Sequence, residues 1–289
     1  MTRLYKGRDY WLFILPALAV FAFVHVLPFL SGFYLSLTDW NGVRGNPEWV
    51  GFANFTGALK DEAFLRSIRF SIGFVVVSTI LINVLGFFLA VLVTRNFRGK
   101  HIFRTFYFVP NLIGGIILGF TWQYIFTEVF ASLGALTGQA GLVGWLSDPN
   151  TGFWGLVIVF SWKMSGYTMT IYIAALESIP VELLDAGQID GAGPLQRIRH
   201  IVFPMVASAF SICLFLIISM SFKLFDENIS LTDGGPFRST EMMSLNIYAT
   251  AFRFNDMGIA QAKAMVFFVL VSLIGVVQYL ITRRREIEQ

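Results

Sequence analysis

Long runs without charge alternate with short polar segments along this chain of 289 residues. An apolar run of about 20 residues is the length that an α-helix needs to cross a bilayer. The pattern predicts an all-α integral membrane protein with six transmembrane helices. Their expected bounds are 10–37, 70–93, 106–126, 152–176, 203–224 and 263–281. The first run is longer than the apolar region of a signal peptide and no Ala-x-Ala site follows it, so we expect it to be retained.

Composition supports this reading. Charged residues make up 13% of the chain, whereas a soluble domain carries about 25%. The single cysteine, Cys213, lies inside an apolar run, which excludes a disulfide framework and a cysteine-based metal site. The net charge of +3 is too small to indicate a nucleic-acid partner.

The distribution of Lys and Arg predicts the orientation in the membrane. With the N-terminus inside, the short inner segments hold twelve of these residues and the longer outer segments hold eight. Positive residues concentrate on the cytoplasmic side of membrane proteins. Both termini are therefore expected in the cytoplasm, together with the polar segment that follows the fourth span.

That polar segment, residues 182–204, reads ELLDAGQIDGAGPLQRIRHIVFP. Pro180 suits the first turn of a helix of about three turns, and acids near its start face the positive end of the helix dipole. The Gly-Ala-Gly stretch at 191–193 ends this helix, and Pro194 starts a second one. Two such helices on the membrane surface could fill a groove in a partner protein. An ordinary amphipathic loop explains the spacing equally well.

The order of residues in this segment resembles the EAA motif of permease subunits in binding-protein-dependent ABC importers. The matching positions are Asp185-Ala186-Gly187, Asp190-Gly191-Ala192, Ile201 and Pro204. Asp185 stands where the family usually has Glu. The resemblance implies that Glu182, together with the residues from Asp185 to Ala192, forms a cytoplasmic coupling helix that docks in a cleft of an ATPase subunit.

Three further stretches carry the resemblance along most of the chain. They are residues 13–42, residues 99–122 and LTDGGPFRSTEMMSLNIYATAF at 231–252. The last is similar to the external loop of the maltose, multiple-sugar and glycerol-3-phosphate type. The resemblance implies the type I importer fold, with a coupling segment at 178–202 and a core at 66–282 inside one permease domain, 10–282. Cytoplasmic tails at 1–9 and 283–289 flank that domain.

The same resemblance implies partners and a location. No G-x-x-x-x-G-K-[ST] occurs in the chain, since Gly99-Lys100 is followed by His and lacks the preceding glycine. We therefore expect a non-enzymatic subunit without a cofactor, in which partner ATPase subunits bind ATP and magnesium. The implied partners are a second homologous permease, two ATPase copies, an extracellular or periplasmic sugar-binding protein and the lipid bilayer. The implied location is the cell or inner membrane of a bacterium or archaeon.

A candidate substrate path follows from an ionisable residue inside a span, which is costly in lipid and commonly functional. Lys163 is such a residue, and helical spacing places it on one face with other large side chains. Alignment with the family adds two residues of the fifth span. The candidate set is Phe160, Lys163, Met164, Tyr167, Ser221 and Leu224. Alternatively, Lys163 snorkels to the outer interface. Because Phe160 and Leu224 cannot hydrogen-bond a hydroxyl, either the second permease supplies the sugar site or the path in this chain is mostly a conduit.

Other polar and small residues receive structural interpretations. Asn83 is interpreted as an interhelical hydrogen bond, and Lys223, Asp226 and Glu227 as a solvated helix end. Glycines at 114, 115 and 119 are expected to allow close helix approach.

Two other classes of function remain as alternatives. An ion-coupled secondary transporter would need acids inside the membrane, but spans one to four hold none apart from Glu128 and Glu177 at boundaries. A membrane-embedded enzyme would need clustered polar groups, but the three histidines are dispersed. Within the importer class, a glycerol-3-phosphate carrier shares the same pattern.

Overall fold

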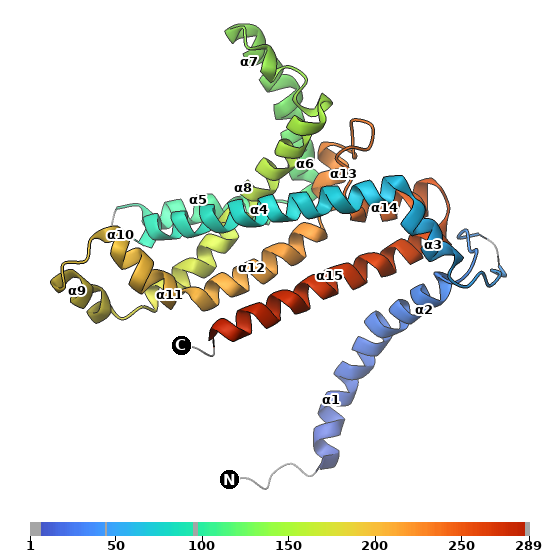
Figure 1. Ribbon diagram of the computed structural model, residues 1–289, viewed down its shortest axis with the longest axis horizontal. Helices are drawn as coiled ribbons and strands as arrows, with labels where there is room; N and C mark the ends of the chain where they lie inside the picture. The colour runs from blue at the N-terminus through green and yellow to red at the C-terminus, as the bar shows by residue number, and fades with distance from the viewer. Residues whose placement is uncertain (1–6, 44, 95–97, 287–289) are drawn as a thin grey trace. The chain divides into compact units, whose positions relative to one another are not determined.

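The computed structural model describes residues 7–43, 45–94 and 98–286 and confirms the all-α class. Within these ranges extended pairing is limited to one isolated bridge between Thr38 and Trp49. The chain forms two compact units, one of residues 1–64 and 247–269 and the other of residues 65–246 and 270–289. Figure 1 labels the helices of both units. The predicted tails fall partly outside the described residues, and their cytoplasmic location stays a prediction.

The first unit is built around an N-terminal helix that has no buried apolar face. Its elements are α1 (Gly7–Phe21), a π-helical turn (Ala22–Val26), α2 (Leu27–Leu35), α3 (Ala53–Lys60), a second π-helical turn (Ala249–Arg253) and the first part of α15 (Met257–Glu286). Pro28 cannot donate a backbone N–H, and the helix widens just before it. No side chain from residue 13 to residue 31 is buried within this chain.

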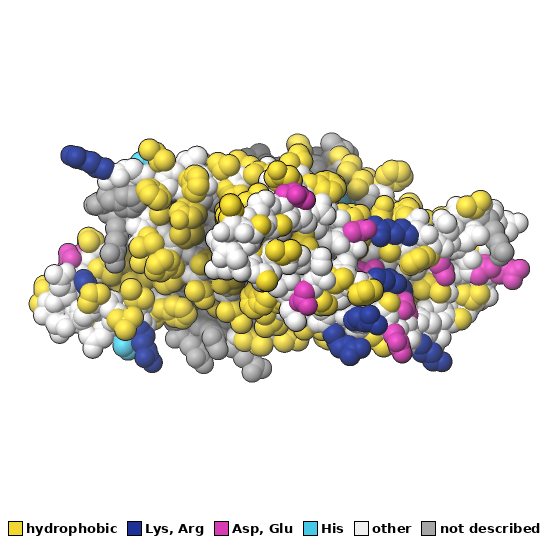
Figure 2. Space-filling view, turned by 90° about the horizontal axis from the view of Figure 1, so that it is seen from above, with side chains coloured by type: hydrophobic (Ala, Val, Ile, Leu, Met, Phe, Trp, Pro, Cys, Tyr) yellow, Lys and Arg dark blue, Asp and Glu magenta, His cyan; other side chains and the backbone are white. Residues whose placement is uncertain are grey.

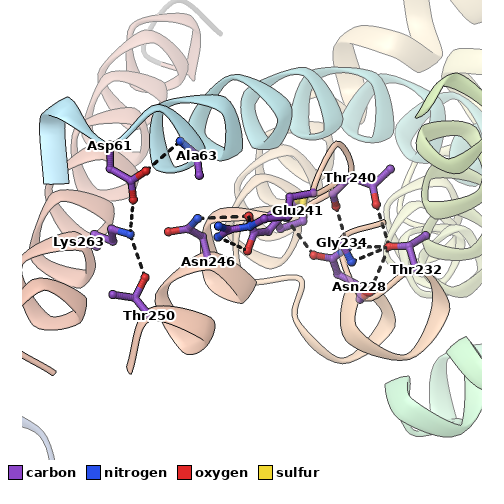
Figure 3. A network of polar contacts seen from close by, with 12 residues as sticks. Asp61, Ala63, Asn228, Thr232, Gly234, Thr240, Glu241, Asn246, Thr250 and Lys263 are labelled. Carbon is purple, nitrogen blue, oxygen red and sulfur yellow. Dashed lines mark hydrogen bonds and ion pairs between the residues drawn. The ribbon is translucent and has the colours of Figure 1, made fainter. Parts of the chain in front are cut away.

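A buried lysine holds α15 within this unit. Lys263 is 3% exposed, and its Nζ lies 2.7 Å from Asp61 Oδ2 and donates to Thr250 Oγ1 at 2.8 Å (Figure 3). Burial raises the pKa of Asp61, but the hydrogen bond and charge of Lys263 and the N–H groups of Ala63 and Phe64 outweigh it. The pKa of Asp61 therefore lies below its ordinary value. The cluster joins the first part of α15 to the end of α3.

The second unit is a helical bundle around α4, α8 and α12. Its elements are α4 (Glu62–Thr94), α5 (Lys100–Leu112), α6 (Gly115–Tyr124), a π-helical turn (Ile125–Val129), α7 (Phe130–Thr137), 3-10 turns at Ala140–Leu142 and Trp145–Ser147, α8 (Pro149–Glu177), α9 (Val181–Ile189), α10 (Pro194–Arg197), a π-helical turn (Ile198–Val202), α11 (Phe203–Met205), α12 (Ala207–Phe222), α13 (Asp226–Leu231) and α14 (Met243–Tyr248). Two buried clusters, one around Phe160 and one around Tyr172, join these three central helices.

Small residues set the closest helix contacts in this unit. A Cβ on Gly166 would overlap the carbonyl of Tyr107, so α8 and α5 touch backbone to backbone. A Cβ on Gly119 would overlap the side chain of Ser230, which confirms the expected close approach on α6. The interpretation of Asn83 is also confirmed, because the Tyr172 hydroxyl on α8 donates to Asn83 Oδ1 on α4 at 2.7 Å.

The apolar helices agree with the predicted spans in part. Four described helical stretches are long and apolar enough to cross a membrane: Phe13–Leu35, Glu62–Thr94, Gly115–Thr137 and Met257–Thr282. Pro194–Met205 and Ala207–Phe222 form a further, bent candidate. The predicted third span, 106–126, is wrong, because α5 ends at Leu112 and α6 begins at Gly115. Pro110 lacks a donor and glycine is a poor helix former, which favours this break.

The fourth predicted span corresponds to α8, which is not among these candidates. Its length of 29 residues is sufficient, but polar and small residues such as Ser161, Lys163 and Gly166 interrupt its apolar sequence. Apolar side chains cover much of the face of the molecule seen in Figure 2, and charged side chains occupy smaller areas of it. The structure thus supports a membrane protein, whereas the count of six spans stays a prediction.

Candidate functional site

The polar segment after α8 folds into the predicted pair of short helices. They are α9, ending at Ile189, and α10, beginning at Pro194. Pro180 takes the N-cap position of α9, one residue before the first turn in which it was predicted. Beyond α10 the helix bends by 69° and continues as α12. The segment therefore leads directly into one of the three central helices of the second unit.

A glycine turn ends α9. Gly191 has φ +79°, a left-handed backbone that favours glycine. Its N–H donates to the Gln188 carbonyl at 3.1 Å, and the Ala192 N–H donates to the Gly187 carbonyl at 2.9 Å. This pair of bonds is the Schellman motif, which satisfies carbonyls at a helix end. A Cβ on Gly191 would meet no atom within 4 Å, so the backbone and not packing requires glycine here.

A second glycine joins α9 to the helix that follows. Gly187 is buried, and a Cβ at this position would lie 2.6 Å from Ile201 Cδ1. Arg197 Nη1 donates to Gln188 Oε1 at 3.2 Å across the same contact. These contacts hold the two helices together as one hairpin, so a force on α9 would reach the residues that lead to α12.

The outer surface of the hairpin combines acids with exposed apolar side chains. Apart from buried Gly187 and half-buried Ala192, the motif residues are exposed: Glu182, Asp185, Ala186, Asp190 and Gly191. The side chains of Val181, Leu183 and Ile189 are 59%, 44% and 86% exposed. Apolar anchors within a polar rim are typical of protein interfaces. The hairpin could therefore enter an apolar groove of a partner that also offers basic groups.

An ion pair stabilises the helix ends from which the hairpin starts. Arg104 Nη2 on α5 lies 2.6 Å from Glu177 Oε1 at the end of α8. A groove runs beneath the hairpin, lined by Val91, Thr94, Leu176, Ile179, Leu184, Pro194, Arg197, Ile198 and Val202. The ion pair thus joins the end of α8, from which the hairpin starts, to α5, and residues of α4, α8 and the hairpin line the groove.

The six predicted path residues do not form one open surface. Phe160, Met164 and Leu224 lie in the hydrophobic core, where the Phe160 ring packs 5.6 Å from the Phe74 ring. Ser221 is also buried. Lys163 and Tyr167 retain partial exposure. The role of this set in substrate contact stays a prediction. Among its members, Lys163 also forms an ion pair with a residue outside the set.

Lys163 forms an ion pair with a buried carboxylate that links two helices. Its Nζ lies 2.6 Å from Glu227 Oε1 on α13, and the two side chains are 18% and 5% exposed. The interpretation of Glu227 as part of a solvated helix end is therefore wrong, although its neighbours Lys223 and Asp226 are exposed. The first turn of α13 directs Asp226 outward and Glu227 toward α8. The sequence gives no local signal for this ion pair, because 64 residues separate Lys163 from Glu227.

Two helix breaks meet at this ion pair. α6 begins at Gly115 after the break at 113–114, and α13 begins at Asp226 after the break at 223–225. A Cβ on Gly115 would lie 2.6 Å from Asp226 Cβ and 3.0 Å from Glu227 Cδ. The N-terminal turn of α6 therefore lies beside the Glu227 carboxylate, and its dipole favours the negative charge.

The loop after α13 is held by a buried asparagine. Asn228 Nδ2 donates to the Thr240 carbonyl at 2.8 Å, and the Met242 N–H donates to Asn228 Oδ1 at 3.0 Å (Figure 3). Arg238 and Glu241 add a two-pronged ion pair at 2.8 and 2.9 Å. The segment that resembles the family's external loop is thus an ordered loop, with Phe237 93% exposed near its tip.

Comparison with known proteins places the chain among transport proteins. The family described as "Binding-protein-dependent transport system inner membrane component" matches residues 82–287. A probable starch degradation products transport system permease of Thermoanaerobacterium thermosulfurigenes is 49% identical over 98% of this chain and 97% of its own length. The sn-glycerol-3-phosphate transport system permease of Agrobacterium fabrum is 27% identical over 95% and 94%. A solved bacterial ABC transporter involved in import of the acidic polysaccharide alginate superposes with a TM-score of 0.83, at 21% identity over 96% of both chains.

Proposed function

The chain belongs to the family of binding-protein-dependent transport system inner membrane components, and from this we propose that it is a transmembrane subunit of an ATP-driven oligosaccharide importer. It forms half of the translocation path, and a second permease forms the other half. Two ATPase subunits and an extracellular or periplasmic sugar-binding protein complete the machine. Both termini and the α9–α10 hairpin face the cytoplasm.

The exposed hairpin carries the docking part of this proposal. It matches the family's coupling motif, presents Ile189 with 86% of its surface exposed, and is fixed to the following helix through Gly187. Closure of the ATPase pair on ATP pushes α9, and the hairpin passes the displacement to α12. The path then opens to the outside and receives the sugar from its binding protein.

The substrate class rests on the relatives. The permease that is 49% identical over nearly the whole chain is named for starch degradation products, which are α-linked glucose oligosaccharides. The relative named for glycerol-3-phosphate is only 27% identical. An oligosaccharide is therefore the preferred substrate, and glycerol-3-phosphate is the alternative.

Two substitutions of Gly191 separate backbone strain from contact with a partner. Both variants place a side chain on a left-handed residue, which costs about 1–2 kcal/mol. A Cβ there meets open space, so the bulk of Trp is free to project toward a docked subunit. The importer, purified with its co-purifying subunits and placed in vesicles with the binding protein, is assayed for ATP hydrolysis and maltotriose uptake. Gly191→Ala should transport nearly normally, whereas Gly191→Trp should lose most uptake or release the ATPase.

Gly138→Trp is the matched control. Gly138 also has positive φ and open space around its Cβ, but it lies at the end of α7, outside the hairpin. It should retain uptake. If Gly191→Trp transports as well as Gly191→Ala, the hairpin is not the docking element. If the purified complex contains no ATPase and moves solute without ATP, the chain works as a secondary transporter instead.

A further inference from the structure

Charged side chains inside the second unit gather at one level of the bundle. α4 from Phe70 onward, α6 and α12 carry none, and α8 carries only Lys163 between Gly152 and Leu176. Three further charged residues lie around the start of α13: Lys223, in the segment between α12 and α13, and Asp226 and Glu227, the first two residues of α13. Together with Lys163, which pairs with Glu227, they are called here the four-charge cluster. It holds two positive and two negative groups.

The four-charge cluster has no net charge, and each of its two cations has an acid nearby. Two of its members, the partly exposed Lys163 and the buried Glu227, pair at 2.6 Å and are 18% and 5% exposed. Its exposed members, Lys223 and Asp226, lie three residues apart at the same helix break. The Lys163 cation is thus already neutralised by a carboxylate, and the exposed Lys223 has an exposed acid nearby.

The four-charge cluster lies where two helix breaks meet, a position that is typical of a substrate path through the membrane. Helix breaks inside transporters commonly line the substrate site, because freed backbone groups need polar surroundings. Here the breaks at 113–114 and 223–225 meet at Glu227, as the contacts of Gly115 show. The partly exposed Tyr167 lies one helical turn from Lys163 and adds an aromatic surface that suits a sugar ring.

We propose that Glu227 determines the charge class of the substrate, restricting this subunit to neutral oligosaccharides and excluding anionic ones. The inference deepens the proposed function and rests on it. With Glu227 in place, an anionic sugar would find no excess positive charge to offset the loss of its hydration on entering the path. Without Glu227, Lys163 would be an unpaired cation that attracts such an anion.

The test measures direct sugar binding by the purified importer without its binding protein. Thermal unfolding is followed with increasing maltotriose or maltotrionate, the same trisaccharide with its reducing end oxidised to a carboxylate. A bound ligand raises the unfolding midpoint by an amount that grows with the logarithm of the ligand concentration divided by its Kd. The unaltered complex should bind maltotriose at least about tenfold more tightly than maltotrionate. In Glu227→Gln the ratio should fall to about one or invert.

Three variants control this result. Glu241→Gln also removes a buried carboxylate from an ion pair, but outside the cluster, and should leave the ratio unchanged. Lys163→Met with Glu227→Gln restores neutrality and should restore the ratio. Asp226→Asn changes an exposed residue, so it should fold even if Glu227→Gln does not, and it should lower the ratio by a smaller factor because water screens its charge.

Equal binding of both sugars by the unaltered complex would overturn the inference. An unchanged ratio in both Glu227→Gln and Asp226→Asn would also overturn it, as would the absence of binding by either sugar. The proposed function is judged separately, by ATP hydrolysis on addition of maltotriose with the binding protein. A complex that responds there while failing the binding test keeps its function as an importer and loses only this assignment to Glu227.

Discussion

At the scale of single residues, glycine has two distinct roles in this chain. At Gly166 the absence of a side chain lets α8 touch the backbone of α5 at Tyr107. At Gly191 the surroundings are open, and the left-handed backbone itself requires glycine. Membrane helices associate through small residues of the first kind, since lipid provides no hydrophobic drive between helices.

Replacing Gly166 with alanine should therefore destabilise the second unit. The added methyl group overlaps the Tyr107 carbonyl, so the two helices must separate, at a cost of about 1–3 kcal/mol. The measurement is thermal unfolding of the purified protein in mild detergent. Gly73→Ala is the control, because a Cβ at Gly73 on α4 meets no atom within 4 Å and alanine is the better helix former. Equal midpoints for the two variants would contradict the observed contact.

The sequence indicated which polar residues make buried contacts better than it indicated the residues that they contact. Asn83 was predicted to form an interhelical hydrogen bond, and Tyr172 provides it. Glu227 is interpreted from the sequence as part of a solvated helix end with Lys223 and Asp226, and its pairing with Lys163, 64 residues away, is not predicted. Adjacent residues of a helix point in different directions. The sequence alone does not fix whether Asp226 or Glu227 faces α8.

At the scale of elements, the loop after α13 depends on Asn228. The side chain is 0% exposed and serves both the Thr240 carbonyl and the Met242 N–H. Buried main-chain groups that lose such partners cost about 1–3 kcal/mol each. Asn228, which precedes the loop in the chain, therefore ties two of its main-chain groups together, in addition to the ion pair of Arg238 and Glu241.

Replacing Asn228 with alanine should release this loop. Trypsin cleaves after Arg238, and cleavage should become faster in the variant because the loop opens more often. The measurement is the appearance of the two fragments over time on a gel. Asn150→Ala, a change at an exposed side chain in the first turn of α8, should digest at the original rate. Unaltered digestion of the Asn228 variant would show that Arg238, Glu241 and the backbone suffice.

Element prediction succeeded where a local signal was strong. Gly191, Gly193 and Pro194 predicted the hairpin, and its helices end and begin close to the expected residues. The predicted third span failed because hydropathy continues across 113–114, whereas the backbone turns there. Hydropathy predicts which residues lie in lipid, but it carries no information about a break in the helix.

At the scale of the whole molecule, the apolar surface of the described helices exceeds what one chain buries. No side chain from residue 13 to residue 31 is buried, and only 6% of the most apolar stretch of Met257–Thr282 is. Lipid or a partner subunit must cover these helices. The distribution of Lys and Arg then predicts which ends face the cytoplasm.

Cysteine labelling tests this orientation. Cys213 is the one native cysteine and lies buried in α12, so the unaltered chain should give little background with a membrane-impermeant maleimide. Gln188→Cys on exposed α9 should react in inside-out vesicles and not in intact cells stripped of any outer barrier. Gln139→Cys, exposed after α7, should show the opposite pattern. Reversed labelling would invert the assignment and place the hairpin outside.

The ion pair between α8 and α13 also orders events in time. Glu227 follows Lys163 by 64 residues, and a ribosome adds about 5–20 residues per second. Lys163 is therefore added to the chain about 3–13 s before Glu227. During this interval α8, already less apolar than the other long helices, carries a cation whose carboxylate partner does not yet exist. The final packing of α8 against α13 thus depends on residues that are made well after α8 itself.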